Sequence, residues 1–168
     1  ITNNYSRLAN RKIKKALAGG IEVQRERAAG EIINLYINHY ANKHVAIDQK
    51  SYNGLKNIAA RLGPGAVQTY YAHFADGEPA AFYMVFTDSN NAYSIIGGST
   101  EKGKEYGAFF LLTDEAVKAN AGHKKTFRFE GSDLEGIAFF NRQFNPVKIQ
   151  YAHVKFNGLP FPLKLLKR

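Results

Sequence analysis

The residues best suited to chemistry lie in the stretch RFEGSDLEGIAFFNRQF, residues 128–144. Glu130 stands where an alternating segment, typical of a strand, gives way to an amphipathic segment, typical of a helix. Open α/β sheets place their binding crevices at the carboxyl ends of strands. A carboxylate at that position, next to Phe127 and Phe129, is a candidate general base. The alternative is that Glu130 binds Arg128 or a backbone amide, or faces water.

The rest of this stretch has a purely structural interpretation. Ser132 and Glu135 fit a capping box, in which a serine N-cap and a glutamate three residues later satisfy the first amides of a helix. Asn145 and Pro146 suit the end of that helix. The residues expected on its buried face are Leu134, Ile137, Phe140 and Phe144. Glu130 is therefore the residue of the stretch that keeps a chemical role.

Hydrophobic spacing along the whole chain predicts the elements that must position these residues. The expected helices cover residues 4–18, 29–41, 48–62, 105–121 and 133–144. The expected strands cover residues 21–26, 66–75, 79–87, 92–98, 125–130 and 147–156. Asp76-Gly77 is a strong hairpin signal, so the strands between residues 66 and 98 are expected to form an antiparallel meander. The later strand–helix–strand passages allow parallel neighbours.

This element order predicts the fold class α/β (α+β), with a mixed, mostly antiparallel sheet and helices on both faces. The chain has 168 residues, 45% of them hydrophobic, and no internal repeat, so we expect one domain spanning 1–168. The absence of cysteine excludes disulfides and thiolate chemistry and fits a reducing, cytoplasmic location. No apolar run is long enough to span a membrane.

The charge of the chain points to anionic partners. The formal net charge of +9 favours nucleic acid, a phosphorylated cofactor or an anionic surface. The helix expected within residues 1–20 carries a basic stripe at helical spacing, formed by Arg7, Arg11, Lys14 and Lys15. The alternative is a solvated face that serves solubility.

The sequence offers no pattern typical of metal or nucleotide-loop chemistry. None of the five histidines forms an H-x-x-x-H pair, so we expect no structural or catalytic metal site. The chain contains no G-x-S-x-G elbow, P-loop or G-x-G-x-x-G motif.

Three segments carry a resemblance to a known family: SRLANRKIKKALAGGIEV at 6–23, KGKEYGAFFLLTDEAVKANAG at 102–122 and FRFEGSDLEGIAFFNRQFN at 127–145. In their order and spacing they resemble the GNAT N-acyltransferase fold. The local sequence is similar to a narrower branch, the FemAB-like proteins. The match spans nearly the whole chain, and the order of the segments carries more weight than any one motif.

The resemblance implies an acyl-donor site. In GNAT-like folds two neighbouring strands splay, here the strands expected at 92–98 and 125–130, and the gap admits the pantetheine arm of acyl-coenzyme A. The next helix offers its first amides to the pyrophosphate, usually after an Arg/Gln-x-x-Gly-x-Gly/Ala loop. This chain has a cation followed three residues later by glycine, and a second small residue one position early. The implied donor contacts are Lys104, Tyr106, Gly107 and Ala108. The alternative is that Gly107 and Ala108 serve close helix packing.

The later helix departs from the usual GNAT pattern. Many GNAT enzymes carry there a tyrosine that protonates the leaving thiolate, whereas the resemblance puts Asn141 at that position. Asparagine can orient a donor or acceptor by hydrogen bonding but cannot act as an acid. FemAB-like members include enzymes that use aminoacyl-tRNA, which the basic stripe would suit. They usually pair two GNAT-like units, so a homodimer or an upstream partner domain is an open alternative.

The resulting expectation is an N-acyltransferase that uses acyl-coenzyme A as co-substrate and acts on an amine of a small molecule or peptide. Glu130 is its expected base or amine-orienting carboxylate, and Asn141 a contact to donor or acceptor. One alternative is an aminoacyl-tRNA-dependent transferase acting on a peptidoglycan precursor. The other is a binding module that has kept the fold without catalysis.

Overall fold

A computed structural model describes residues 4–40, 48–63, 65–122, 125–131, 133–150 and 156. The helices in these ranges are α1 (Arg7–Ala18), α2 (Ala29–Tyr40), α3 (Gln49–Arg61), α4 (Glu101–Tyr106), α5 (Ala108–Asn120) and α6 (Glu135–Arg142). The strands are β1 (Glu22–Arg25), β2 (Val67–His73), β3 (Pro79–Thr87), β4 (Asn91–Ser99) and β5 (Thr126–Arg128). The predicted order of elements is confirmed from the first helix to α6, except that one predicted helix is two.

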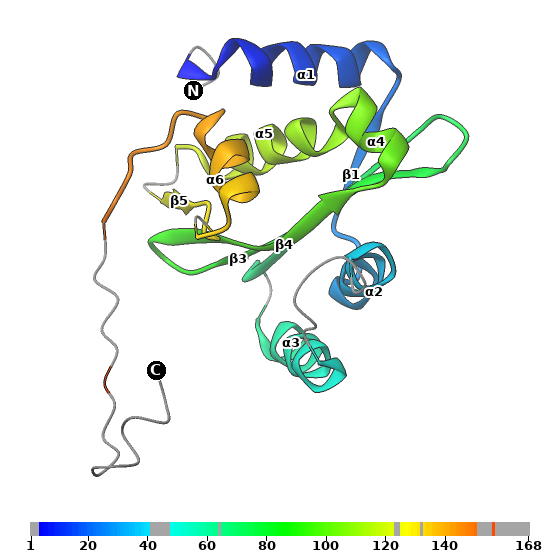
Figure 1. Cartoon of the computed structure of the whole chain (residues 1–168). Helices are drawn as coiled ribbons and strands as arrows, with labels where there is room; N and C mark the ends of the chain where they lie inside the picture. Colours follow the sequence, from blue (N-terminus) through cyan, green and yellow to red (C-terminus); the bar gives the residue numbers. More distant parts are fainter. Residues whose placement is uncertain are drawn as a thin grey trace, which may run out of the picture.

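The sheet is mixed and mostly antiparallel, with the strand order β1-β2-β3-β4-β5. The pairings from β1 to β4 are antiparallel, and β5 pairs with β4 in parallel. In Figure 1, α2 and α3 lie on one face of the sheet, and α4, α5 and α6 lie on the other. Helix α1 packs on α5 on the side away from the sheet. The predicted fold class, with helices on both faces, is therefore confirmed.

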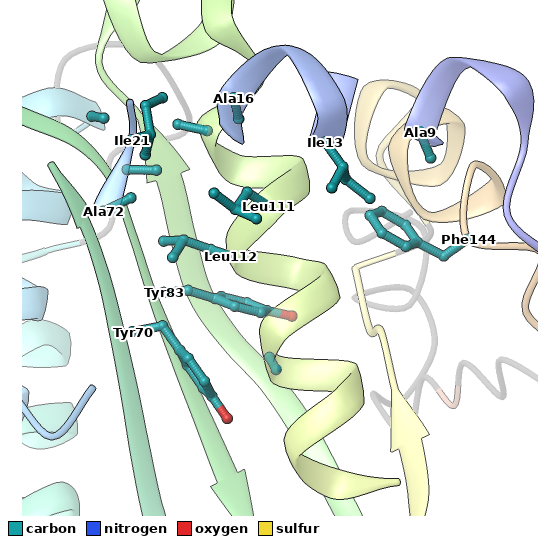
Figure 2. Close-up of a cluster of buried hydrophobic side chains, with 14 of the residues drawn as sticks. Ala9, Ile13, Ala16, Ile21, Tyr70, Ala72, Tyr83, Leu111, Leu112 and Phe144 are labelled. Atoms are coloured by element: carbon teal, nitrogen blue, oxygen red, sulfur yellow. The ribbon is translucent and has the colours of Figure 1, made fainter. Parts of the chain in front are cut away.

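Strand β3 holds the two faces together because its alternate side chains enter two separate hydrophobic clusters. Tyr83 points toward α5, where it joins Tyr70, Leu112 and Ile13 (Figure 2). Phe82 points the other way, into a cluster with side chains of α2 and α3, among them Ile32, Ile33 and Tyr52. Burying one large apolar side chain contributes about 1.5–3 kcal/mol, so both faces are strongly held against β3.

The single helix predicted over 105–121 is wrong in one respect: it is broken at Gly107. This residue is the C-cap of α4 and the N-cap of α5, with a left-handed backbone (φ 82°) that favours glycine. Its N–H donates to the carbonyls of Gly103 and Lys104, which ends α4. The predicted helix also missed α4's own start, where Thr100 Oγ1 accepts from the Gly103 N–H at 3.0 Å.

The predicted start of α6 is wrong as well. The helix begins at Glu135 after Leu134, which makes no side-chain cap, and Ser132 lies outside the described residues. Leu134 and Ile137, predicted to be buried, are 59% and 41% exposed. Only Phe144 of the predicted face is fully enclosed, at 5% exposure, against Tyr5 and the α5 aromatics.

The strand predicted over 147–156 is not formed at 147–150, where the backbone is irregular and exposed. A strand needs a hydrogen-bonded neighbour, and within the described ranges none lies beside this segment. Residues 151–155 of the predicted strand lie outside those that the structure describes.

Candidate active site

The last two strands of the sheet separate after a short pairing. Strand β5 pairs only with Asn91, Ala92 and Tyr93 of the nine-residue β4. From Ser94 to Ser99 the described part of the chain places no strand on this side of β4. We call this open side of β4 the gap. It begins at the pairing with β5 and ends beside α4.

The direction of the backbone groups in the gap follows from alternation along β4. The Thr100 N–H donates to the Ala80 carbonyl of β3 at 3.0 Å, so the backbone N–H of Thr100 points toward β3. Successive residues of a strand direct their N–H and C=O groups to opposite sides. The backbone N–H and C=O of Ser99 therefore point into the gap, where they bind the Tyr40 hydroxyl at 3.1 and 3.2 Å. By the same alternation, Gly97 also presents its N–H and C=O to the gap.

A β-bulge lies at the closed end of the gap. Met84 pairs with Ile96 and Val85 with Ser94, so Ile95 has no register partner on β3. The extra residue of a bulge leaves the ladder, and bulges are frequent beside active sites because they redirect backbone and side chains. The Ile95 amide is therefore a candidate hydrogen-bond donor for a ligand.

Aromatic rings flank the gap on both faces of β4. A Cβ built on Gly97 would lie 2.6 Å from the rings of Phe109 and Tyr83, on the α5 side. A Cβ built on Gly98 would lie 2.6 Å from the Tyr40 hydroxyl, on the α2 side. Only glycine fits at either position while the rings keep their places. Burial raises the pKa of Tyr83, so this side chain stays uncharged where it flanks the gap.

Glu130 lies just beyond β5, at the closed end of the gap. Its side chain is exposed, and its backbone is left-handed (φ 52°), as is that of Gly131 (φ 66°). A left-handed backbone is uncommon for a residue with a Cβ, and such conformations cluster at functional sites. Arg128, the alternative partner named from the sequence, donates through its Nε to Asn91 Oδ1 at 2.8 Å.

The pKa of Tyr93 indicates where the Glu130 carboxylate lies. The pKa of Tyr93 is raised mainly by its hydrogen bond to Asp88, with a smaller contribution from Glu130. The carboxylate therefore lies within electrostatic reach of the first residues of β4, where β5 pairs with them. Asp88 itself is held by the N–H groups of Asn90 and Asn91, both at 2.7 Å, and these bonds lower its pKa.

The structure brings Asn141 to Glu130. Asn141 is 8% exposed, and its Nδ2 donates to the Glu130 carbonyl at 2.9 Å. This bond ties α6 to the left-handed turn at Glu130 and Gly131. The two residues proposed for chemistry thus meet through a backbone oxygen, with Asn141 supporting the turn. Contact of Asn141 with a donor or acceptor stays a prediction.

The four predicted donor contacts lie at the break between α4 and α5. We call this break, residues 103–108, the junction. Lys104 pairs with Glu101 at 2.9 Å, and its carbonyl accepts from the Lys12 ammonium of α1 at 3.5 Å. A Cβ on Gly107 would lie 2.8 Å from the Lys12 carbonyl oxygen, and Ala108 is fully buried. This packing accounts for both small residues, while their contact with a ligand stays a prediction.

Tyr106 and the basic stripe meet on the same side of the molecule. The Tyr106 ring packs edge-on against Phe74, beneath the Lys15 ammonium at 5.3 Å, and leaves room only for a glycine at position 19. The other members of the stripe, Arg7, Arg11 and Lys14, are exposed along α1. Helix α1 thus covers the junction with one face and presents cations on the other.

Sequence reasoning missed three candidates, namely Tyr40, Ile95 and Gly97. The signal available was Gly97-Gly98 inside an expected strand, because glycine in a strand marks a bulge or a close approach. The bulge position and the tyrosine that reaches Ser99 from a distant helix leave no local mark in the sequence.

Other parts of the described structure are weaker candidates for a ligand site. A pocket of about 570 Å³ opens at the β1–β2 edge of the sheet, by the start of β2. Its two arginines, Arg25 and Arg27, already pair with Glu115 and Glu31. Among the described residues, no group of three or more His, Cys, Asp or Glu side chains could hold a metal ion. Within the same ranges, no helix is both long and apolar enough to cross a membrane.

Comparison with known proteins identifies the class. Residues 4–133 match the family described as "Acetyltransferase (GNAT) domain". The chain belongs to this family, and it is an acyltransferase of the GNAT type. No curated protein sequence matches it.

Solved structures share the fold at low sequence identity. An aminoglycoside acetyltransferase from an uncultured soil metagenomic sample, in complex with sisomicin, aligns with a TM-score of 0.58 at 12% identity, covering 84% of this chain and 98% of that one. Aminoglycoside antibiotic 6'-N-acetyltransferase from Acinetobacter baumannii aligns with a TM-score of 0.57 at 9% identity, covering 84% and 99%. FemX aligns with a TM-score of 0.59 at 11% identity, covering 84% of this chain but only 54% of FemX.

Proposed function

We propose that this protein transfers an acyl group from acyl-coenzyme A to an acceptor amine, with the reaction at the closed end of the gap. The observation that carries the proposal is the open side of β4, where Gly97 presents its N–H and C=O and Ile95 leaves the ladder. Family membership supports the reaction class. The FemAB-like branch is part of the proposal, supported by the similarity to FemX.

The gap suits the amide-bearing arm of the donor. An extended chain can add to a free strand edge through main-chain hydrogen bonds. The Gly97 N–H and C=O would bind one amide of the arm, and the aromatic rings of Phe109 and Tyr40 would flank it. Residues Gly107 and Ala108 remain the proposed neighbours of the diphosphate, although α1 covers that backbone. The arm is therefore the better supported half of the donor site.

The chain's own groups supply the remaining chemistry. A bound thioester supplies the acyl group, and the acceptor nitrogen forms the new C–N bond as the C–S bond breaks. The coenzyme A thiolate then leaves and takes its proton from solvent. The Ile95 N–H would donate to the carbonyl oxygen as negative charge develops there. Glu130 would accept the proton that the amine must lose. Two aligned structures are aminoglycoside acetyltransferases, which supports a polar small-molecule amine as the acceptor class.

The test of this function combines binding and turnover. Acetyl-coenzyme A should raise the melting temperature by mass action, whereas coenzyme-free buffer should not. With an amine found by screening, Glu130→Gln should lower kcat on the order of 10²-fold. The matched control is Glu135→Gln, an exposed acid at the start of α6, which should turn over normally. Equal turnover by both variants would remove Glu130 from the mechanism.

A second function is favoured by the exposed cations of α1 together with the similarity to FemX. In it, aminoacyl-tRNA is the donor and a peptidoglycan precursor is the acceptor. Charge reversal at Arg11 and Lys15 should then weaken tRNA binding and reduce its salt slope by about 0.9 per lost phosphate contact. Lys50→Glu, on α3 across the sheet, is the control. Unchanged tRNA binding in the α1 variant excludes a tRNA site on α1.

If the chain binds neither acyl-coenzyme A nor aminoacyl-tRNA, the remaining alternative is a binding module that has kept the fold without catalysis.

A further inference from the structure

One side chain lies in the gap where a ligand is expected. Tyr40, the last residue of α2, reaches across to the end of β4. Its hydroxyl donates to the Ser99 carbonyl at 3.2 Å and accepts from the Ser99 N–H at 3.1 Å. A side chain that binds both backbone groups of one residue mimics the contact that a neighbouring strand would make.

The local packing holds this arrangement in place. The Tyr40 ring lies over Gly98, where any Cβ would overlap it. On its other sides it stacks on Tyr36, with ring centroids 5.3 Å apart, and meets Phe82 edge-on at 6.2 Å. Ser99 is nearly buried, at 6% exposure, so its N–H and C=O need partners from the protein or from a ligand.

We infer that Tyr40 is the gate residue of the gap: its hydroxyl occupies Ser99 in the free protein and is displaced by the amide-bearing arm of the donor. This inference rests on the proposed acyl-donor function and adds a residue that sets donor affinity. A donor that enters the gap past α4 meets Ser99 before Gly97. The arm can pair with Ser99 only if the Tyr40 hydroxyl leaves.

The position of Tyr40 separates this role from acid–base catalysis. Ser99 lies four residues beyond Ile95, which is about 13 Å along an extended strand. A proton donor must reach within hydrogen-bond distance of the reacting atoms. Tyr40 is therefore a positioning residue at the mouth of the gap, and its loss should change donor affinity while kcat stays constant.

Tyr40→Phe tests the inference because it keeps the ring over Gly98 and removes only the hydroxyl. In the free protein, hydrogen exchange of the Ser99 amide should become at least several-fold faster. Acetyl-coenzyme A should bind roughly five-fold more tightly, the equivalent of one net hydrogen bond that no longer has to be broken. Tyr36→Phe, one turn earlier on α2 and stacked on the same ring, is the matched control and should change neither value.

The outcomes distinguish the gate from the function. Faster Ser99 exchange with unchanged or weaker acetyl-coenzyme A binding overturns the gate and leaves the donor proposal standing. Unchanged Ser99 exchange also overturns the gate, whatever the affinity. If neither the native chain nor Tyr40→Phe binds acetyl-coenzyme A, the acyl-coenzyme A function fails, and the gate fails with it. A melting curve for each variant verifies that it is folded.

Discussion

The junction and the gap both require glycine. Backbone atoms pack against the glycines of the junction, whereas aromatic side chains pack against those of the gap. At the junction, a Cβ on Gly103 would overlap the Ala80 carbonyl, and one on Gly107 would press on the Lys12 carbonyl. In the gap, the atoms nearest to a Cβ on Gly97 or Gly98 would belong to aromatic side chains. Backbone is thus packed on backbone in the first region, and rings cover backbone in the second.

This difference bears on which of the two regions can open to admit the acyl-bearing arm of the donor. Backbone that belongs to regular elements cannot move without disturbing those elements, so the junction stays closed as long as the protein is folded. An aromatic ring can change its rotamer without disturbing the chain that carries it. Opening the gap to a ligand therefore requires only side chains to move, which supports the proposal that the donor arm lies along β4.

Gly103→Ala should have the largest effect, because the new methyl group meets a carbonyl that β3 holds in place. We expect the free energy of unfolding to fall by about 3 kcal/mol, measured by urea denaturation. Gly54→Ala is the control, since it also lies inside a helix but has open space around it. That variant should be about 0.5–1 kcal/mol more stable. Equal effects of the two substitutions would contradict backbone closure at the junction.

Gly98→Ala should cost less, because only the Tyr40 ring has to move. We expect a loss of about 2 kcal/mol, which combines the displaced ring with the lost partner of Ser99. Exchange of the Ser99 amide should accelerate in this variant, while amides of α5 stay protected. A loss as large as that of Gly103→Ala would show that the gap is as rigid as the junction.

The same contrast explains what the sequence could predict. Hydrophobic period and turn residues predicted the order of the helices, apart from the division into α4 and α5, and the meander of β2 to β4, because these signals are local. Gly107 was noticed as a small residue, but its left-handed break depends on α1 packing over it. The partial exposure of α6 also depends on distant segments, so the pattern of Leu134 and Ile137 alone could not reveal it.

The candidate site was predictable only in part. Glu130 stood out because a strand was expected to end there, and the structure places it beside the pairing of β4 and β5. The contacts of Tyr40 with Ser99 and of Asn141 with Glu130 join residues 59 and 11 positions apart. Hydrogen bonds over such separations have no periodic signature in the sequence.

Asn141→Ala should have a smaller effect than either glycine substitution, since it removes one side-chain hydrogen bond at the closed end of the gap. We expect a loss of about 1 kcal/mol in unfolding free energy. Turnover should fall through a misplaced Glu130, with donor affinity unchanged. Arg142→Ala, the exposed neighbour on α6, should be neutral. Weaker donor binding by Asn141→Ala would favour direct ligand contact instead.

The smallest expected effect concerns the turn that holds the closed end of the gap. Asp88 accepts from the N–H groups of Asn90 and Asn91, which lowers its pKa from the ordinary value of 3.8. A lowered pKa contributes stability that is complete above the ordinary value and is lost as the pH falls through the folded value. The native chain should therefore exceed Asp88→Asn in melting temperature near pH 6, and the difference should begin to shrink as the pH falls below the ordinary value of 3.8.

The loss of the Asp88 charge at low pH should also affect the two ends of β4 differently. The Asn90 carbonyl accepts from the Thr126 N–H at 2.8 Å, so protonation of Asp88 loosens the turn on which β5 begins its pairing. The protection factor of the Thr126 amide, which corrects the exchange rate for its intrinsic pH dependence, should fall at low pH, whereas protection of the Ser99 amide at the open end should respond to Tyr40. Tyr93→Phe removes one donor to Asp88 and should narrow the same window. A melting-temperature difference that stays constant from pH 6 to pH 3 would show that the Asp88 charge does not hold the turn.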